Sequence, residues 1–317
     1  MKYRHHKAFT FIELLFVIIV LGVIGGVAIE AIRQYYEGIF KTNSYTKKVT
    51  EADHILELLS GYFENAIDAS IVNLDQDAAD GTSNGTCFGD LQDEAEITAH
   101  DYTVAFVGVD SDSLHVVGNP GWSEMAQGFS GTLGTSMTSS DANFTAANGI
   151  IAALRPGTGI INSAVYNDEV IGDAIGSCGY FNWDNLGGNQ AYYSIIGVNY
   201  MTNTLTLTNH STVSPQRNDR KYLLRTGYAF RVMDTGRLVI YNNFRPWRGE
   251  NYNSGTTSTL GEGVASFYAA FDARNSHSDR GGLWKLKVCM QGLDSNLSNS
   301  DEAVKEICRE RMVHVRY

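Results

Sequence analysis

The sequence is poor in proline, and the positions of its few prolines are informative. Only four of the 317 residues are proline, and none of them lies between residues 9 and 69. Because proline interrupts helices, its absence there permits one long N-terminal helix. Its scarcity elsewhere excludes a proline-rich linker, and the 32 glycines favour a domain of strands and loops.

Basic residues and catalytic motifs are also scarce. The chain has 24 lysines and arginines against 35 aspartates and glutamates, for a formal net charge of −11. An acidic chain without a basic tract argues against nucleic-acid binding. The sequence has no HExxH motif, no Gly-x-Ser-x-Gly motif and no phosphate-binding glycine loop. We therefore expect neither an enzyme nor a resident cofactor.

Cysteine is limited to four residues: Cys87, Cys178, Cys289 and Cys308. They are too scattered to form the paired CxxC spacing of a structural zinc site, so no metal site is predicted from them. All four follow the N-terminal apolar segment described next, on the side expected to be exported and oxidising. Four cysteines allow three disulfide connectivities.

What the sequence does contain is one long apolar run near its start. The sixteen residues from Leu14 to Ile29 carry no charge, and residues 9–12 extend the run to about 20 residues. That length crosses a hydrocarbon core of ~30 Å as a helix, so residues 9–32 are predicted to be a transmembrane segment. Glu13 lies inside the run, where a carboxylate costs about 2.5–3.5 kcal/mol. A simple membrane anchor does not require a carboxylate in its apolar run, so we expect the Glu13 side chain to have a partner.

A short basic leader, residues 1–8, precedes the run and contains Lys2, Arg4 and Lys7. Excess lysine and arginine marks the cytoplasmic side, so the rest of the chain is expected across the membrane. A secretory signal peptide would be cut after small residues beyond the apolar run, and residues 29–33 form a poor site of that kind. The expected cut lies between Ala8 and Phe9, and it leaves the apolar helix in the mature protein.

The basic leader, the small residue and the stretch Phe9-Thr10-Phe11-Ile12-Glu13 before an apolar run resemble the N-terminus of type IV pilins and type II secretion pseudopilins. The family usually has glycine at the position of Ala8 and leucine at that of Phe11. The resemblance implies cleavage between Ala8 and Phe9 and N-methylation of Phe9. It also implies that Glu13 neutralises the free amine of Phe9 on a neighbouring subunit, since a buried charge is tolerated only when it is paired.

The same resemblance implies a structural role. The chain would be a minor pilin or pseudopilin of a type IV pilus or type II secretion filament, with its helix in the bacterial inner membrane and its C-terminal head in the periplasm. Its partners would be a prepilin peptidase/methyltransferase and other pilins or pseudopilins. The alternative is a membrane-anchored periplasmic enzyme or binding protein that does not polymerise. A substrate cleft would favour the alternative, and a processed N-terminus would favour the filament subunit.

The helical pattern continues beyond the membrane segment. Apolar residues recur at helical spacing from Ile55 to Ile67, which predicts a stripe packed on the head. We expect one helix over residues 9–70, about 60 residues and ~90 Å long, with Gly38 and Gly61 as the positions for a bend.

Residues 71–317 are predicted to be the head. Strands that follow a long helix, without alternating with helices, predict an α+β fold with an antiparallel sheet. The order and size of the late strands resemble the larger minor pilins and J-type pseudopilins. Residues 118–165 are predicted to be an irregular insert. The predicted strands are 102–109 with 114–117, 192–198 with 204–208, 228–233 with 237–241, and then 264–271, 283–290 and 311–317.

Two of the late predicted strands bear on the cysteines. Cys289 and Cys308 fall in or beside neighbouring strands, and pilins often close a C-terminal loop with a disulfide. We therefore favour the pairs Cys289–Cys308 and Cys87–Cys178.

Two weaker motifs remain. Asp75, Asp77 and Asp80 resemble part of a calcium loop but lack the oxygen spacing and final glutamate of an EF-hand. A solvated acidic loop is favoured there, with calcium as the alternative. The stretches around Asn143 and Asn296 fit the acidic glycosylation sequon of some bacteria, and a chance match is favoured for both.

Overall fold

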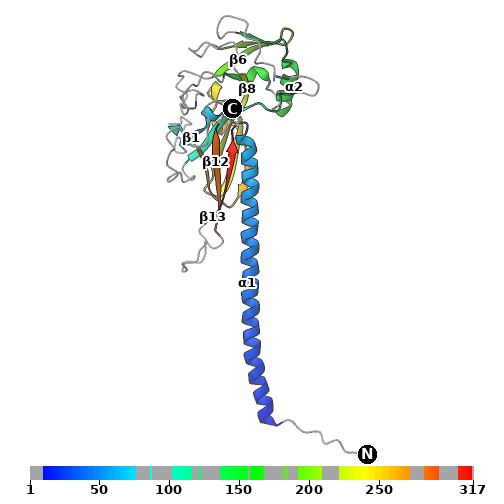
Figure 1. The fold of residues 1–317 in the computed structure, drawn as a ribbon, viewed down its shortest axis with the longest axis vertical. Helices are drawn as coiled ribbons and strands as arrows, with labels where there is room; N and C mark the ends of the chain where they lie inside the picture. The colour runs from blue at the N-terminus through cyan, green and yellow to red at the C-terminus, as the bar shows by residue number, and fades with distance from the viewer. Residues whose placement is uncertain are drawn as a thin grey trace, which may run out of the picture.

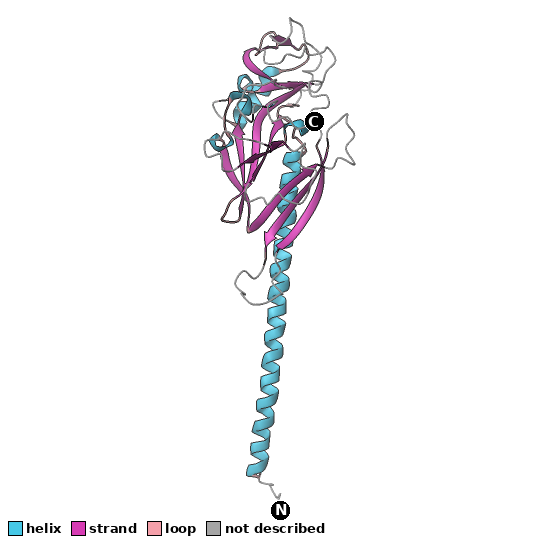
Figure 2. Ribbon diagram, turned by 90° about the vertical axis from the view of Figure 1, so that its left-hand side faces the viewer, coloured by secondary structure: helices cyan, strands magenta, loops and turns pink. Residues whose placement is uncertain are grey.

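The protein has a long N-terminal helix that carries a β-rich head at its C-terminal end (Figure 1; Figure 2). The structure is a computed structural model. It describes residues 10–75, 86–87, 102–115, 121–122, 136–155, 158–167, 181, 183, 192–208, 221–271, 282–292 and 306–315. Within these ranges the α+β class is confirmed, since the sheet pairings are antiparallel.

The helix α1 (Phe11–Phe63) has 53 residues, which corresponds to a length of about 80 Å. It begins after Thr10, whose hydroxyl accepts a hydrogen bond from the backbone N–H of Glu13. It continues through both Gly38 and Gly61, the positions where the sequence suggested a bend.

The helix ends at Phe63 and not near residue 70, because the following residues bond to a strand. The backbone N–H of Ile67 donates to the carbonyl of Val107 at 3.0 Å, and the N–H of Val109 donates to the carbonyl of Asn65 at 2.8 Å. The one-turn helix η1 (Asp68–Ser70) then leads into the sheet. Ile67 is buried as the apolar pattern predicted, but against strands and outside a helix.

The larger sheet contains ten strands in the described part of the chain. Its main path runs through β2 (Thr86–Cys87), β1 (Val72–Asp75), β3 (Tyr102–Val109), β8 (Lys221–Val232), β5 (Ala164–Asn167), β6 (Tyr192–Asn199), β7 (Thr204–Leu207) and β4 (Ser136–Thr138). From β8 the sheet also branches to β9 (Arg237–Phe244) and β10 (Thr256–Glu262). The branch arises because β8 is long enough to pair with two strands along the same edge. Its residues 221–224 pair with β5, and its residues 227–232 pair with β9.

A separate three-stranded sheet, β11 (Val264–Phe271), β12 (Leu283–Gln291) and β13 (Glu306–His314), lies alongside the upper part of α1 in both views (Figure 1; Figure 2). The described residues also contain a second α-helix, α2 (Phe144–Leu154). It begins after Asn143 and lies in the part of the head far from the N-terminus of α1 (Figure 1).

The central strands have an apolar core on each face, because successive side chains of a strand point to opposite sides. Phe106 of β3 and Phe230 of β8 belong to the core formed with α1 and the three-stranded sheet. Their neighbours Ala105 and Ala229 belong to the other core, which contains α2. The sheet thus joins the helix-bound half of the head to the distal half.

Several predicted strands are confirmed and others differ. The pairs β6–β7 and β8–β9 form the expected hairpins, and β11 and β12 lie where predicted. Residues 114–115 form a turn and not a strand, and residues 116–117 lie outside the described part. The expected irregular insert contains α2, β4 and the start of β5 in its described part.

The sequence predicted no strand at β1, β2, β4 or β5, and two further strands differ from the prediction because their side chains are polar. β10 is an exposed, threonine-rich strand that the sequence did not predict. β13 begins at Glu306 and not at Arg311, and its first half is charged. Arg309 on this strand pairs with Asp53 of α1 at 2.9 Å, so charged side chains also join β13 to the helix.

Candidate functional site on the N-terminal helix

The helix α1 has a packed half and an exposed half. The packed half begins at Lys48, whose ammonium donates to the carbonyls of Gln291 and Gly292 at the end of β12. The buried side chains of α1 are Ala52, Ile55, Leu56, Leu59 and Phe63, and all of them follow that point. The half before Lys48 extends beyond the described part of the head (Figure 1; Figure 2).

The exposed half presents a continuous apolar surface. Its most apolar 18-residue window has a mean hydropathy of 2.8, and none of that window is buried within the chain. Soluble monomers rarely expose a contiguous apolar surface of this extent, and such surfaces mark contacts with a membrane or a partner. The exposed large apolar residues are Phe11, Ile12, Leu14, Leu15, Phe16, Val17, Ile18, Ile19, Val20, Leu21, Val23, Ile24, Val27, Ile29 and Ile32.

By length and composition α1 is sufficient to cross a membrane, and it is the one helix of the described residues that meets this criterion. The apolar surface ends where charges begin. Arg33 donates from Nε to Glu37 at 2.9 Å and lies 4.0 Å from Glu30. Tyr35 and Tyr36 follow on exposed positions, as aromatic residues do at a membrane–water boundary.

Glu13 is the one acidic residue among residues 11–29 of α1, and it lies in the first turn of the helix. The positive end of the helix dipole favours a carboxylate at this position. The side chain is exposed, and among the described residues no lysine or arginine forms an ion pair with it. Any partner for this carboxylate must therefore come from outside the described residues. Ala8 and Phe9 lie outside the described residues, so the cleavage and methylation stay predictions.

Three small residues interrupt the apolar surface. A Cβ atom added at Gly22, Gly25 or Gly26 would have no atom of the chain within 4 Å apart from the helix backbone. These positions are therefore open to close approach by another helix, the role that small residues have in membrane helix packing.

The packed half fixes the head rigidly to the helix. Phe63 is fully buried and its ring centroid lies 4.7 Å from that of Phe106 on β3. Arg311 of β13 donates to Glu57 of α1 at 2.8 Å, but this pair is exposed and contributes little to stability. The buried apolar contacts therefore contribute most of the attachment of the helix to the sheets.

One of the two predicted disulfides is confirmed. Cys289 on β12 lies opposite Cys308 on β13, and the structure joins them by a disulfide. Glu306 is near both sulfur atoms, but bonded sulfurs are not the thiolates that a metal site needs. The pairing Cys87–Cys178 stays a prediction, because Cys178 and the side chain of Cys87 lie outside the described residues.

The weaker motifs are resolved in part. The side chain of Asp75 and residues Asp77 and Asp80 lie outside the described part, as does Asn296. Asn143 lies immediately before α2, and its side-chain oxygen accepts a hydrogen bond from the N–H of Ala146 at 2.9 Å. Its side-chain amide therefore caps α2, and this role explains the asparagine at position 143 without a glycan.

The head also contains buried acids that the sequence did not indicate. Asp110 follows β3 directly, and the Ser113 hydroxyl donates to its carboxylate while the indole N–H of Trp122 donates to its backbone carbonyl. Burial raises the pKa of Asp110, and Arg225 opposes this rise from 3.9 Å. These contacts close the turn after β3, which explains why the expected strand at 114–117 does not start there.

Comparison of the chain with protein-family models, with curated proteins and with solved structures found no match. The resemblance to pilins and pseudopilins therefore rests on the N-terminal residues.

Proposed function

We propose that this chain is a structural subunit, a minor pilin or pseudopilin, of a type IV pilus or type II secretion filament. The observation that carries the proposal is the division of α1. One half presents an exposed apolar surface over residues 11–29 whose single acid, Glu13, lies close to its start, and the other half packs on the head. This is the layout that the pilin-like N-terminal sequence implies.

The two halves suit a subunit that leaves the membrane to join a filament. Before assembly the apolar surface is covered by lipid, and after assembly by the helices of neighbouring subunits. The free amine of Phe9 then enters an apolar bundle, where the Glu13 carboxylate of a neighbour neutralises it. Because the pair forms at one axial offset only, it favours the correct register between subunits.

Processing and location follow from the same proposal. A prepilin peptidase/methyltransferase cuts between Ala8 and Phe9 and methylates Phe9. The membrane segment holds the processed chain in the inner membrane, and the head lies in the periplasm, where the Cys289–Cys308 disulfide is stable.

The alternative function is a membrane-anchored periplasmic enzyme or binding protein that does not polymerise. It uses the same exposed helix as an anchor alone. In that case Glu13 has no neighbour to pair with and its cost in the bilayer is uncompensated. This cost favours the filament subunit.

The test is the chemical state of the N-terminus. Intact-mass and peptide analysis of the membrane-bound protein should find Phe9 as the first residue, carrying a methyl group. Ala8→Leu should block this cut, while the matched change Ala31→Leu, beyond the apolar run, should not. Protein that retains Met1, or a cut near Ala31, would contradict the proposal.

A further inference from the structure

A bare stretch of α1 lies between its apolar surface and its packed half (Figure 1; Figure 2). We call residues 33–47 the stalk. Every stalk residue is exposed except Ser44, which is partly exposed. The transmembrane segment of the proposed function ends at residue 32, so Lys47, fifteen residues further along the helix, lies about 22 Å beyond that end.

The stalk is helical although its sequence favours a helix only weakly. Gly38 and residues 42–46, which are Thr, Asn, Ser, Tyr and Thr, are weak helix formers. Most of the stability of a helix in a protein comes from packing, and the exposed stalk has little packing among the described residues. The helical stalk therefore indicates a further contact that stabilises it.

One face of the stalk carries exposed aromatic rings. Tyr36 is 55% exposed and Phe40 is 70% exposed, and residues four apart lie on the same face of a helix. Lys47 follows Phe40 by seven residues, about two turns, so it shares this face. Aromatic residues are enriched where proteins contact one another, so this face has the composition of a contact surface.

The charge of the stalk is opposite to the charge of the head. Residues 38–50 contain three lysines and no acid, whereas residues 49–216 contain 21 aspartates and glutamates and a single arginine. Lys48 donates to carbonyls at the end of β12. Lys41 and Lys47 are exposed and form no ion pair with a carboxylate among the described residues. Two unpaired cations therefore project from the stalk of a chain whose head is acidic.

The position of these lysines favours a protein over a lipid surface as their partner. Along the helix, Lys41 lies about 14 Å and Lys47 about 22 Å beyond the end of the transmembrane segment. Attraction to anionic lipid headgroups decays within a Debye length, which is ~8 Å at physiological salt. Both lysines lie beyond that range, so the complementary charge has to come from a protein surface.

We propose that the stalk docks on the acidic head of a second copy of this chain. Lys41 and Lys47 pair with carboxylates of residues 49–216 of that copy, and the rings of Tyr36 and Phe40 lose their exposure in the same contact. This contact goes beyond the proposed function. It rests on the membrane span of that proposal, and not on processing of the N-terminus or on growth of a filament.

The first test is the salt dependence of self-association. The purified full chain in a non-ionic detergent is studied by sedimentation at about 0.01 M and about 1 M salt, where the Debye lengths are ~30 Å and ~3 Å. The chain should associate at low salt, and its association constant should fall about tenfold or more at high salt. A chain that is monomeric at low salt, or association that salt leaves unchanged, overturns the contact.

A pair of variants separates the stalk from general repulsion between acidic chains. Lys47→Glu should weaken association at low salt about tenfold or more, because it places an acid against the acids of the second copy. The matched change Arg237→Glu makes the same change of charge at an exposed arginine of β9 and should weaken association far less. Equal weakening by both variants, or none by Lys47→Glu, overturns the role of the stalk.

Crosslinking identifies the partner. A carbodiimide joins a lysine to a carboxylate that it contacts, and an equal mixture of two isotope-labelled preparations distinguishes links between copies. Crosslinked peptides of Lys41 or Lys47 should combine both labels and contain acids of residues 49–216. Links that always carry a single label would place the acid in the same chain and overturn the second copy. Recovery of the unaltered chain in the membrane fraction tests the span separately, and a chain that washes off the membrane would overturn the span and this contact together.

Discussion

The carboxylate of Asp68 accepts a hydrogen bond from the indole N–H of Trp284, with 2.5 Å between Oδ1 and Nε1. Asp68 lies in η1, just after α1, and Trp284 lies in β12, so the bond joins the end of the helix to the three-stranded sheet. Burial raises the pKa of Asp68 from 3.8 to about 6, although this hydrogen bond and the nearby His314 of β13 both oppose the rise. The ionised form of Asp68 therefore destabilises the fold.

The first prediction follows from the direction of this shift. A carboxyl whose pKa is higher in the folded state stabilises at low pH, and the contribution is lost as pH rises through about 6. We expect Asp68 to contribute about 1.4 kcal/mol less stability at pH 7.5 than at pH 5. Asp68→Asn should remove this difference in urea unfolding at the two pH values. Asp53→Asn, a change at an exposed acid, should retain it. An identical pH dependence in Asp68→Asn and the unaltered protein would contradict the assignment.

The second prediction separates the two halves of α1. Phe63→Ala should lower the free energy of unfolding of the head by about 3–5 kcal/mol, because it leaves a cavity against Phe106 and Phe230. Leu14→Ala, on the exposed half, should not change it measurably. Denaturant unfolding in detergent, followed by tryptophan fluorescence, measures both. A comparable loss in Leu14→Ala would mean that the apolar half packs on the head.

The third prediction concerns the disulfide. Peptide mapping without reductant should recover Cys289 linked to Cys308, whose sequence separation is 19 residues. Closing a loop of this length stabilises by about 3 kcal/mol on the chain-entropy estimate, so the double serine variant should lose a similar amount. Free thiols at both positions in exported protein would show that the bond does not form.

The division of α1 was predictable from the sequence because both halves have strong patterns. The uncharged run from Leu14 to Ile29 and the helical spacing after Ile55 identify the exposed and packed halves without the structure. The end of the helix was not predictable. Residues 66 and 67 continue the apolar spacing, but the backbone of Asn65 and Ile67 bonds to β3. A periodic pattern reports the burial of side chains and not the partner of the backbone.

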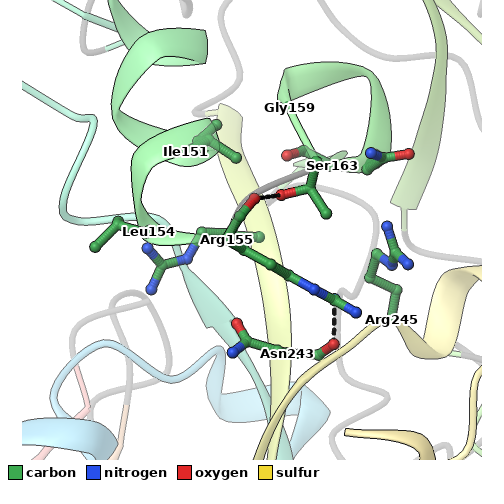
Figure 3. Close-up of a pocket in the computed structure, with 10 residues that line it drawn as sticks. Ile151, Leu154, Arg155, Gly159, Ser163, Asn243 and Arg245 are labelled. Atoms are coloured by element: carbon green, nitrogen blue, oxygen red, sulfur yellow. Dashed lines mark hydrogen bonds between the residues drawn. The ribbon is translucent and has the colours of Figure 1, made fainter. Parts of the chain in front are cut away.

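A group of three arginines in the head was not predictable, for a different reason. Arg155 follows α2, and its guanidinium donates to the carbonyl of Asn243 in β9 (Figure 3). Its neighbours Arg225 and Arg245 are distant in the sequence and belong to β8 and to the end of β9. Only the branching of the sheet at β8 brings the three arginines together. The helix α2 itself was missed because its glycine, alanine and asparagine residues resemble a loop in composition.

The last prediction concerns Glu13, which is exposed and without an ion-pair partner in the described part of the chain. If its partner is the Phe9 amine of a neighbouring subunit, Glu13→Ala should leave membrane insertion intact or improve it, because a polar residue leaves the bilayer. Assembly should fail, since the neighbour's ammonium loses its partner and breaking a buried pair costs about 3–5 kcal/mol.

Membrane level, N-terminal processing and co-purification with other filament subunits are measured for each variant. Val20→Ala is the matched control, because it shortens an exposed apolar side chain of the same helix without removing a charge. Normal membrane level with lost co-purification is expected for Glu13→Ala alone. Membrane insertion depends on the sum of the apolar residues, whereas the register between subunits depends on the single pair of Glu13 and the Phe9 amine. Only a role of Glu13 in assembly therefore predicts lost co-purification at a normal membrane level. Unchanged co-purification in Glu13→Ala would show that the helix serves as an anchor and not as a filament contact.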